Sequence, residues 1–198
     1  MPASIDAEGF VLRPWRRGDG EVLFARIDAD RARLGAWLPW PPYHQCVEDS
    51  EDYARRMQAK WWTREDFAMG MWADGLVGSV GVHVVDWDLR RFEIGYWVGA
   101  PFEGRGFVRR GAAIAAALAF ELLGAGRVEI RHIVGNTRSE AVPRALGFVD
   151  EGVLRGAIRP PEGVRADVRY WSLTPEEYGA APWRLDAAQR VFSGGVEG

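Results

Sequence analysis

The sequence predicts one domain of the mixed α/β (α+β) class. Its length of 198 residues is that of a single domain. Along the chain, the apolar residues switch several times between the spacing of a helix and the alternation of a strand. Several predicted strands follow one another directly, so the chain is not a regular alternation of strand and helix. These observations indicate a mixed sheet with flanking helices.

The first half of the chain is predicted to hold helices followed by a hairpin. Three prolines among residues 37–42 remove backbone donors, so this segment is predicted to be a rigid aromatic loop. Asp74 and Gly75 stand between two apolar runs, a pattern that predicts a tight hairpin turn. The expected elements are a strand at 10–15, helices at 21–29 and 48–64, and strands at 67–72 and 76–85.

The second half is predicted to alternate between strands and helices. Ile114, Leu118 and Leu122 lie at helical spacing, and Gly124 and Gly126 end that helix. The expected elements are a strand at 91–98, a glycine-rich segment at 99–106, helices at 107–123 and 137–146, and strands at 127–134, 148–155 and 167–173. Residues past 175 are expected to form a terminal appendage.

Composition and charge exclude several classes of protein. The single cysteine, Cys46, cannot form an internal disulfide, and with three histidines it cannot complete a usual structural zinc site. No apolar stretch reaches about 18 residues and no signal peptide is recognisable, so we expect no membrane partner and a cytoplasmic location. The net charge of −3 argues against binding to nucleic acid.

The segment from Glu103 to Arg109 carries the clearest functional signal. It lies between a predicted strand and a predicted helix, and it holds Gly104 and Gly106. The first N–H groups of a helix are unpaired and partly positive, and glycines let a backbone approach its ligand closely. Such a loop can bind phosphate, and Arg105 adds positive charge. The alternative is an ordinary tight turn.

Two common phosphate-binding motifs are absent from the sequence. No G-x-x-x-x-G-K-[ST] loop occurs. A dinucleotide fingerprint needs a third glycine where Arg109 stands, and the next glycine, Gly111, comes two residues too late. A nicotinamide cofactor is therefore disfavoured.

Five short motifs occur in order along the chain. They are Glu93-Ile94-Gly95-Tyr96-Trp97-Val98, Glu103-Gly104-Arg105-Gly106, Asn136-x-x-Ser139, Leu146-Gly147-Phe148 and Glu151-Gly152-x-Leu154-Arg155. Together they resemble the GNAT superfamily of acyl-CoA N-acyltransferases, and within it the RimJ/RimL-like subgroup of ribosomal-protein N-terminal acetyltransferases. The resemblance covers residues 10–175 of a single domain at 1–198, with 176–198 as a C-terminal appendage. It implies a mostly antiparallel seven-stranded sheet flanked by helices, with central strands splayed around a coenzyme A site.

The resemblance also implies an activity. It is the direct transfer of an acetyl group from acetyl-CoA to a primary amine, without a metal. The expected acceptor is the N-terminal α-amine of a protein. The resemblance also implies a bacterial enzyme and allows it to be a homodimer. A small-molecule amine, another acyl donor such as succinyl-CoA, and a non-catalytic acyl-CoA-binding module are the alternatives.

The cofactor site follows from the same resemblance. In the family, a Q/R-x-x-G-x-G/A loop binds the diphosphate of coenzyme A, and here that loop departs at Glu103 and Val108. The implied cofactor-binding residues are Glu103, Gly104, Arg105, Gly106, Phe107, Val108 and Arg109 for the diphosphate, and Tyr96, Trp97, Val98, Asn136 and Ser139 for the pantetheine arm and thioester. Asn136 is alternatively the N-cap of the following helix.

The resemblance assigns two catalytic candidates and an acceptor wall. Glu93 matches a strand glutamate that serves as general base, and its alternative is a structural ion pair with Arg91 or Arg131. Ser139 would bond or protonate the leaving sulfur, and its alternative is an ordinary serine in the first turn of a helix. The backbone N–H of Val98 would polarise the thioester carbonyl. Aromatic residues of the proline-rich loop are the substrate-binding candidates, with simple hydrophobic packing as the alternative; they are Trp37, Trp40 and Tyr43.

Overall fold

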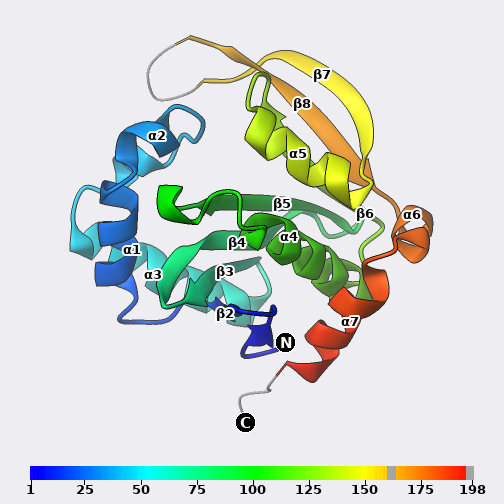
Figure 1. Cartoon of the computed structure of the whole chain (residues 1–198), viewed down its shortest axis with the longest axis horizontal. Coiled ribbons are helices and arrows are strands. Elements are labelled where there is room, and N and C mark those ends of the chain that lie inside the picture. The colour runs from blue at the N-terminus through cyan, green and yellow to red at the C-terminus, as the bar shows by residue number, and fades with distance from the viewer. Residues whose placement is uncertain (160–163, 195–198) are drawn as a thin grey trace.

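The computed structural model describes residues 1–159 and 164–194, and within them the chain forms one eight-stranded sheet (Figure 1). The strand order is β1-β2-β3-β4-β5-β6-β8-β7. Of the pairs described, β5–β6 is parallel and the others are antiparallel. The strands are β1 (Ile5–Asp6), β2 (Val11–Pro14), β3 (Asp66–Ala73), β4 (Gly75–Asp86), β5 (Arg91–Val98), β6 (Arg127–Ile133), β7 (Val149–Ile158) and β8 (Ala166–Leu173).

The mixed, mostly antiparallel sheet is confirmed, but the expected number of seven strands is wrong. The additional strand is β1, whose Ile5 lies opposite Leu12 of β2. Both side chains are buried, so the core begins before residue 10. A strand of two residues is too short to show an alternating pattern, and for this reason the sequence did not reveal it.

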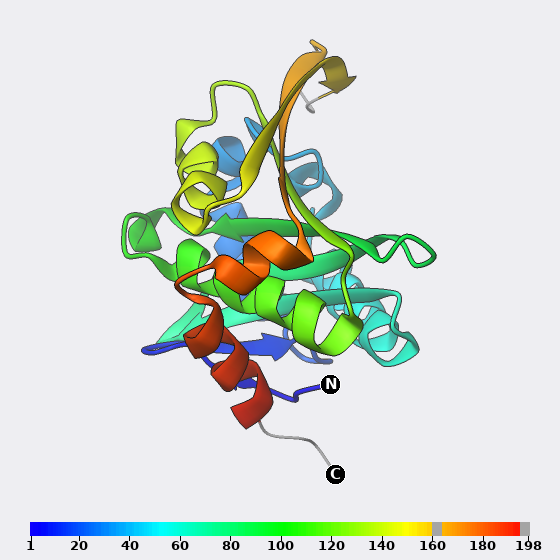
Figure 2. The same ribbon diagram turned by 90° about the vertical axis from the view of Figure 1, so that its right-hand side faces the viewer.

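Helices cover both faces of the sheet (Figures 1 and 2). A small core that includes Leu23, Ala54 and Ala68 joins one face to α1 and α3. A larger core that includes Ile94 and Ile114 joins the opposite face to α4. The helices are α1 (Gly20–Asp28), α2 (Arg31–Gly35), α3 (Val47–Thr63), α4 (Phe107–Ala117), α5 (Thr137–Leu146), α6 (Pro175–Ala180) and α7 (Arg184–Ser193), with 3-10 turns at Pro41–Tyr43 and Ala100–Phe102. None of the described helices is long and apolar enough to cross a membrane.

The C-terminal segment is an integral part of the larger core. The appendage expected at 176–198 is described as far as residue 194, and it forms most of α6 and all of α7. Tyr178 stacks on Phe120 with 4.4 Å between ring centroids, and Val191 is buried against the same cluster. The helix expected at 107–123 is interrupted by a π-helical turn at Leu118–Leu122, which lies next to this contact.

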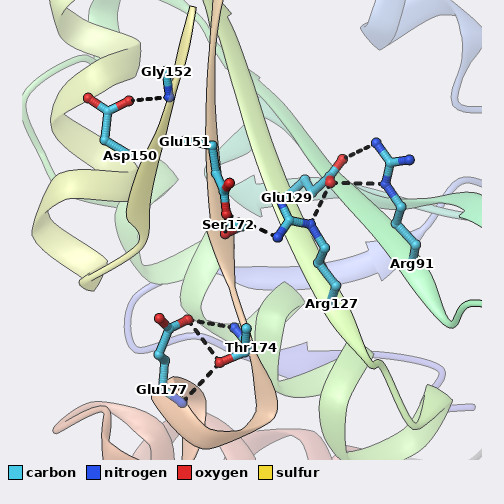
Figure 3. A network of polar contacts seen from close by, with 9 residues as sticks. All are labelled: Arg91, Arg127, Glu129, Asp150, Glu151, Gly152, Ser172, Thr174 and Glu177. Carbon is cyan, nitrogen blue, oxygen red and sulfur yellow. Dashed lines mark hydrogen bonds and ion pairs between the residues drawn. The ribbon is translucent and has the colours of Figure 1, made fainter.

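The parallel strands β5 and β6 separate partway along their length. They are paired from Arg91–Arg127 to Glu93–Glu129, although both strands continue beyond that point. The buried carboxylate of Glu129 holds the paired end, because Arg91 Nε and Arg127 Nε bond it at 2.9 and 2.7 Å (Figure 3). Burial alone would raise the pKa of Glu129, but these two guanidinium groups lower it. The strands are therefore fixed at one end and open at the other.

Candidate active site

A cleft of about 1580 Å³ lies where β5 and β6 separate. Every residue that the sequence nominated for the site lines this cleft. They are Trp37, Trp40, Tyr43, Glu93, Tyr96, Trp97, Val98, Glu103, Gly104, Arg105, Gly106, Phe107, Val108, Arg109, Asn136 and Ser139. The fold thus brings together segments that are up to about a hundred residues apart in the chain.

The glycine loop before α4 has the backbone geometry of an anion site. Gly104 and Gly106 have φ angles of +72° and +77°, a left-handed conformation that disfavours other residues. A Cβ placed on Gly104 would meet nothing within 4 Å, so the loop backbone is open to a ligand. The N-terminus of α4 follows directly at Phe107, and its first N–H groups are free of intrahelical partners.

Glu103, the acidic departure in this loop, is held by two arginines. Its Oε1 lies 2.7 Å from Arg33 Nη1 of α2, and its Oε2 lies 2.9 Å from Arg138 Nη1 of α5. The negative charge is therefore balanced within the protein. The same contacts link α2 to α5, which are about a hundred residues apart in the sequence and line the same cleft.

The end of β5 has backbone groups that are free of the sheet ladder. Gly99 N donates to Val77 O, so the neighbouring residue, Val98, directs its backbone groups away from β4. Its carbonyl accepts a hydrogen bond of 2.7 Å from Arg33 Nη2. Because β6 has already separated from β5 here, the backbone of Tyr96 and Val98 can pair with an extended ligand.

Tyr96, Ser139 and Asn136 form one hydrogen-bonded group at the start of α5. Asn136 Oδ1 accepts from Ser139 N at 3.1 Å, which is the N-cap arrangement that the sequence allowed. Ser139 Oγ donates to Tyr96 Oη at 3.2 Å, and Tyr96 Oη donates to the Ser139 carbonyl at 3.0 Å. That carbonyl is free because Pro143, four residues later, has no N–H. Burial raises the pKa of Tyr96, so its hydroxyl stays protonated.

Glu93 lies on the other face of β5 and is ion-paired. Arg131 Nε of β6 lies 2.9 Å from both carboxylate oxygens. The Glu93 side chain is 19% exposed and that of Arg131 is 48% exposed. The structure therefore contains the ion pair that formed the alternative interpretation of Glu93.

Sequence reasoning missed a histidine–aspartate pair beside Glu93. His83 Nδ1 of β4 lies 2.9 Å from Asp66 Oδ2 of β3, and His83 is directly opposite both Asp66 and Glu93 in the sheet. Desolvation alone would lower the pKa of His83, but the hydrogen bond and charge of Asp66, with the charge of Glu93, raise it. Alternation along β4 could have placed His83 on this face, but its partners depend on strand register.

The aromatic residues of the proline-rich loop form one wall of this face. Trp40 packs against Trp97 of β5 and against His44, with 5.7 and 5.6 Å between ring centroids. Trp37 is less buried, and Tyr43 is 76% exposed. The wall thus combines hydrophobic packing at Trp40 with exposed aromatic surface at Tyr43.

The two faces of β5 present different chemistry to the cleft. Tyr96 and Ser139 lie on the side of α4 and α5, beside the glycine loop. Glu93 and His83 lie on the side of α1 and α3, with the aromatic wall. A donor bound on the first side can therefore meet an acceptor bound on the second through the gap between β5 and β6. No group of three or more metal-ligating side chains occurs in the described part of the chain.

Comparisons with known proteins agree with this geometry. A model of the Acetyltransferase (GNAT) domain family matches residues 10–149. A Bacillus subtilis (strain 168) protein named "Putative ribosomal N-acetyltransferase YdaF" is 33% identical over 178 residues, which are 86% of this chain and 94% of that protein.

Solved structures show the same fold. Mycobacterium smegmatis RimJ in complex with CoA-disulfide is 27% identical, with a TM-score of 0.81 over 96% of this chain and 94% of that one. RimL, a ribosomal L7/L12 alpha-N-protein acetyltransferase in complex with coenzyme A, is similar in fold, with 20% identity and a TM-score of 0.81 over 88% of this chain and 99% of that one. The family match over most of the sequence, together with the cleft, shows that this chain belongs to the GNAT acetyltransferase family and is an acetyl-CoA-dependent N-acetyltransferase.

Proposed function

We propose that this enzyme acetylates the N-terminal α-amine of a protein, of the ribosomal-protein type. The observation that carries the proposal is the cleft that reaches both faces of the sheet at the β5–β6 gap. A flexible peptide end can enter on the face of the aromatic wall, while acetyl-CoA occupies the face of the glycine loop. The name of the Bacillus subtilis relative supports the same acceptor class.

In this proposal the backbone of β5 and α4 binds the donor. The N–H groups of the loop from Gly104 to Val108 hold the diphosphate, with Arg105 and Arg109 nearby. The pantetheine arm runs along Tyr96, Trp97 and Val98, next to Asn136, and pairs with the backbone groups of Tyr96 and Val98 that face away from β4. These backbone donors do not depend on the side chains of Glu103 and Val108, so the two departures from the family loop leave the site intact.

The catalytic steps need a base, a polarised carbonyl and a proton for sulfur. The N–H of Val98 polarises the thioester carbonyl. The amine attacks that carbonyl directly, and the Ser139 hydroxyl turns from Tyr96 to the departing sulfur and supplies a hydrogen bond or proton to it. Glu93 is the proposed carboxylate of the base system, acting from the acceptor face. The proposal includes a cytoplasmic location, since ribosomal proteins are made in the cytoplasm. It also includes a homodimer, which the resemblance allows.

An acceptor panel tests this function. The purified protein would be incubated with acetyl-CoA or succinyl-CoA and one of three amines: peptides with free N-terminal serine or alanine, or benzylamine. Each product would be identified by mass spectrometry. We expect acetylation of the peptides at the α-amine, with kcat/KM at least tenfold above that for benzylamine, and N-acetylated peptides serve as controls. Acetylation of benzylamine alone would contradict the protein acceptor, and a preference for succinyl-CoA would contradict the donor.

A further inference from the structure

We propose that His83, oriented by Asp66, is the group that takes up the proton lost by the acceptor amine. The inference deepens the proposed function, because it concerns the base of the same reaction. It is carried by the geometry of the acceptor face of β4 and β5, independently of the family motifs.

The imidazole of His83 is fixed at one nitrogen and free at the other. Both oxygens of Asp66 lie within 3.1 Å of Nδ1. This contact places the proton on Nδ1 of the neutral ring and leaves Nε2 with a lone pair. Within residues 1–159 and 164–194, no protein group bonds Nε2. A carboxylate that orients the imidazole of a general base has the same arrangement in hydrolytic enzymes.

Two glycines make room for the ring on the floor of the cleft. A Cβ at Gly95 would lie 2.9 Å from His83 Nε2, and a Cβ at Gly81 would lie 3.2 Å from His83 Cε1. The imidazole therefore lies over the backbone of β4 and β5, with Nε2 directed to Gly95. Gly95 belongs to the part of β5 from which β6 has separated, on the path to Val98. The side chain of His83 is 40% exposed, so an amine and water in the cleft can reach it.

Glu93 is less suited to accept this proton itself. Both of its oxygens lie 2.9 Å from Arg131 Nε, so the carboxylate is already engaged in an ion pair within the sheet. Its charge, together with that of Asp66, instead stabilises the imidazolium that His83 becomes. In this arrangement Glu93 is a positioning residue that acts through His83.

The surrounding charges set the sign of the pH dependence. His83 faces Asp66 from β3, Glu93 from β5 and Arg131 from β6, and Tyr53 and Arg56 of α3 line the same cleft. The two carboxylates raise the pKa of His83, whereas desolvation and Arg131 lower it. A base must be neutral to act, so the rate should rise with pH through the raised pKa of His83 and then reach a plateau.

The proton balance of the reaction is complete with this assignment. The acceptor ammonium gives one proton, through water in the cleft, to His83 Nε2. The neutral amine forms the C–N bond with the thioester carbonyl, and the C–S bond breaks. The second proton of the amine goes to the sulfur through Ser139. His83 then releases to solvent the proton that it accepted on Nε2. No oxidant, metal or further reactant is needed.

The test compares variants in single-turnover rate against pH. We would measure wild type, His83→Gln, Asp66→Asn and Glu93→Gln with acetyl-CoA and the fastest amine of the panel above. Asp52→Asn serves as the control for loss of a carboxylate, because Asp52 of α3 is exposed and lies outside the lining of the cleft. The slow hydrolysis of acetyl-CoA, in which water must lose its proton in the same place, gives a readout that needs no acceptor.

We expect His83→Gln to lower the plateau rate by about 100-fold or more. It should also remove the pH limb, which is the rising part of the plot of rate against pH, and leave the acetyl-CoA Kd unchanged within twofold. Asp66→Asn and Glu93→Gln should shift the limb to lower pH, since each removes a charge that raises the pKa of His83. Retention of both rate and limb in His83→Gln would overturn the proposal. Failure of the peptide acceptors alone would overturn only the proposed function, because benzylamine and water still report on the base.

Folding is checked separately. The far-UV circular dichroism of each variant should match wild type and its Tm should stay close to wild type, because the side chain of His83 is only partly buried. If His83→Gln does not fold, Asp66→Asn provides the test. A rate that rises over the same pH range in Asp66→Asn as in wild type would also overturn the proposal.

Discussion

The hydroxyl of Ser139 is positioned by residues of its own helix. Asn136 caps the helix through Ser139 N, and Pro143 leaves the Ser139 carbonyl free for the Tyr96 hydroxyl. An ordinary residue at position 143 would offer an N–H to that carbonyl and compete with Tyr96. The proline therefore supports the contact between β5 and α5 on the side of the cleft that holds the glycine loop.

At Ser139 we expect a loss of chemistry without a loss of binding. Ser139→Ala removes the hydrogen-bond donor proposed for the leaving sulfur, so the single-turnover rate should fall by about 100-fold. The acetyl-CoA Kd, measured by calorimetry, should change less than twofold, because the arm is held by backbone. Thr137→Ala, an exposed position in the same first turn, is the control. An unchanged single-turnover rate in Ser139→Ala would remove this residue from the reaction.

Among the elements, the loop before α4 depends on its backbone more than on its side chains. Its glycines adopt positive φ angles, and α4 directs free N–H groups to the same place. The acidic residue at its start is already neutralised by Arg33 and Arg138. An acidic residue in a phosphate-binding loop is therefore compatible with the function.

We accordingly predict that Glu103→Gln binds coenzyme A almost as well as wild type. Partly exposed ion pairs contribute roughly 0–1 kcal/mol each, so the loss of two pairs of about 0.5 kcal/mol would change Kd by about fivefold. Removing the carboxylate also frees the Arg138 guanidinium for the phosphates, which opposes any loss, whereas Arg33 stays bonded to Asp30 and to the Val98 carbonyl. Calorimetric titration with coenzyme A measures the effect. A more than tenfold weaker Kd would show that the ion-paired carboxylate holds the loop in its binding shape.

At the level of the whole molecule, stability depends on the C-terminal helices. Tyr178 stacks on Phe120 and donates to Glu121 Oε1 at 2.9 Å, within the π-helical turn after α4. Arg184 of α7 lies 3.3 Å from the same carboxylate. These contacts brace α4, whose N-terminus follows the glycine loop, against the end of the chain.

A pair of substitutions in α7 tests this contribution. Val191 is 2% exposed, whereas Leu185 of the same helix is 75% exposed. Val191→Ala removes two buried carbon groups, at about 0.8 kcal/mol each, and should lower Tm by roughly 3–6 °C. Leu185→Ala should change the free energy of unfolding by less than about 0.5 kcal/mol. Equal Tm values for the two variants, measured by calorimetry, would contradict the packing of α7 on the core.

Most of the fold and much of the site were predictable from the sequence. Helical spacing, the Asp74-Gly75 turn and the glycine loop are local features, and local backbone preferences largely determine them. The site residues could be nominated because they stand within or beside short motifs. β1, with its two residues, is too short to show an alternating pattern, and the packing of α7 depends on contacts with distant segments.

The sequence by itself determined the strand–loop–helix unit that we propose to bind the donor, since a turn glycine and a helix start need only their neighbours. The tertiary structure alone decided which charges meet on the acceptor face. A bulge between Met71 and Trp72 shifts the β3–β4 register by one residue, so His83 instead of Val82 lies opposite Asp66. A shift of one residue moves a side chain to the other face of a sheet, and no local pattern specifies it.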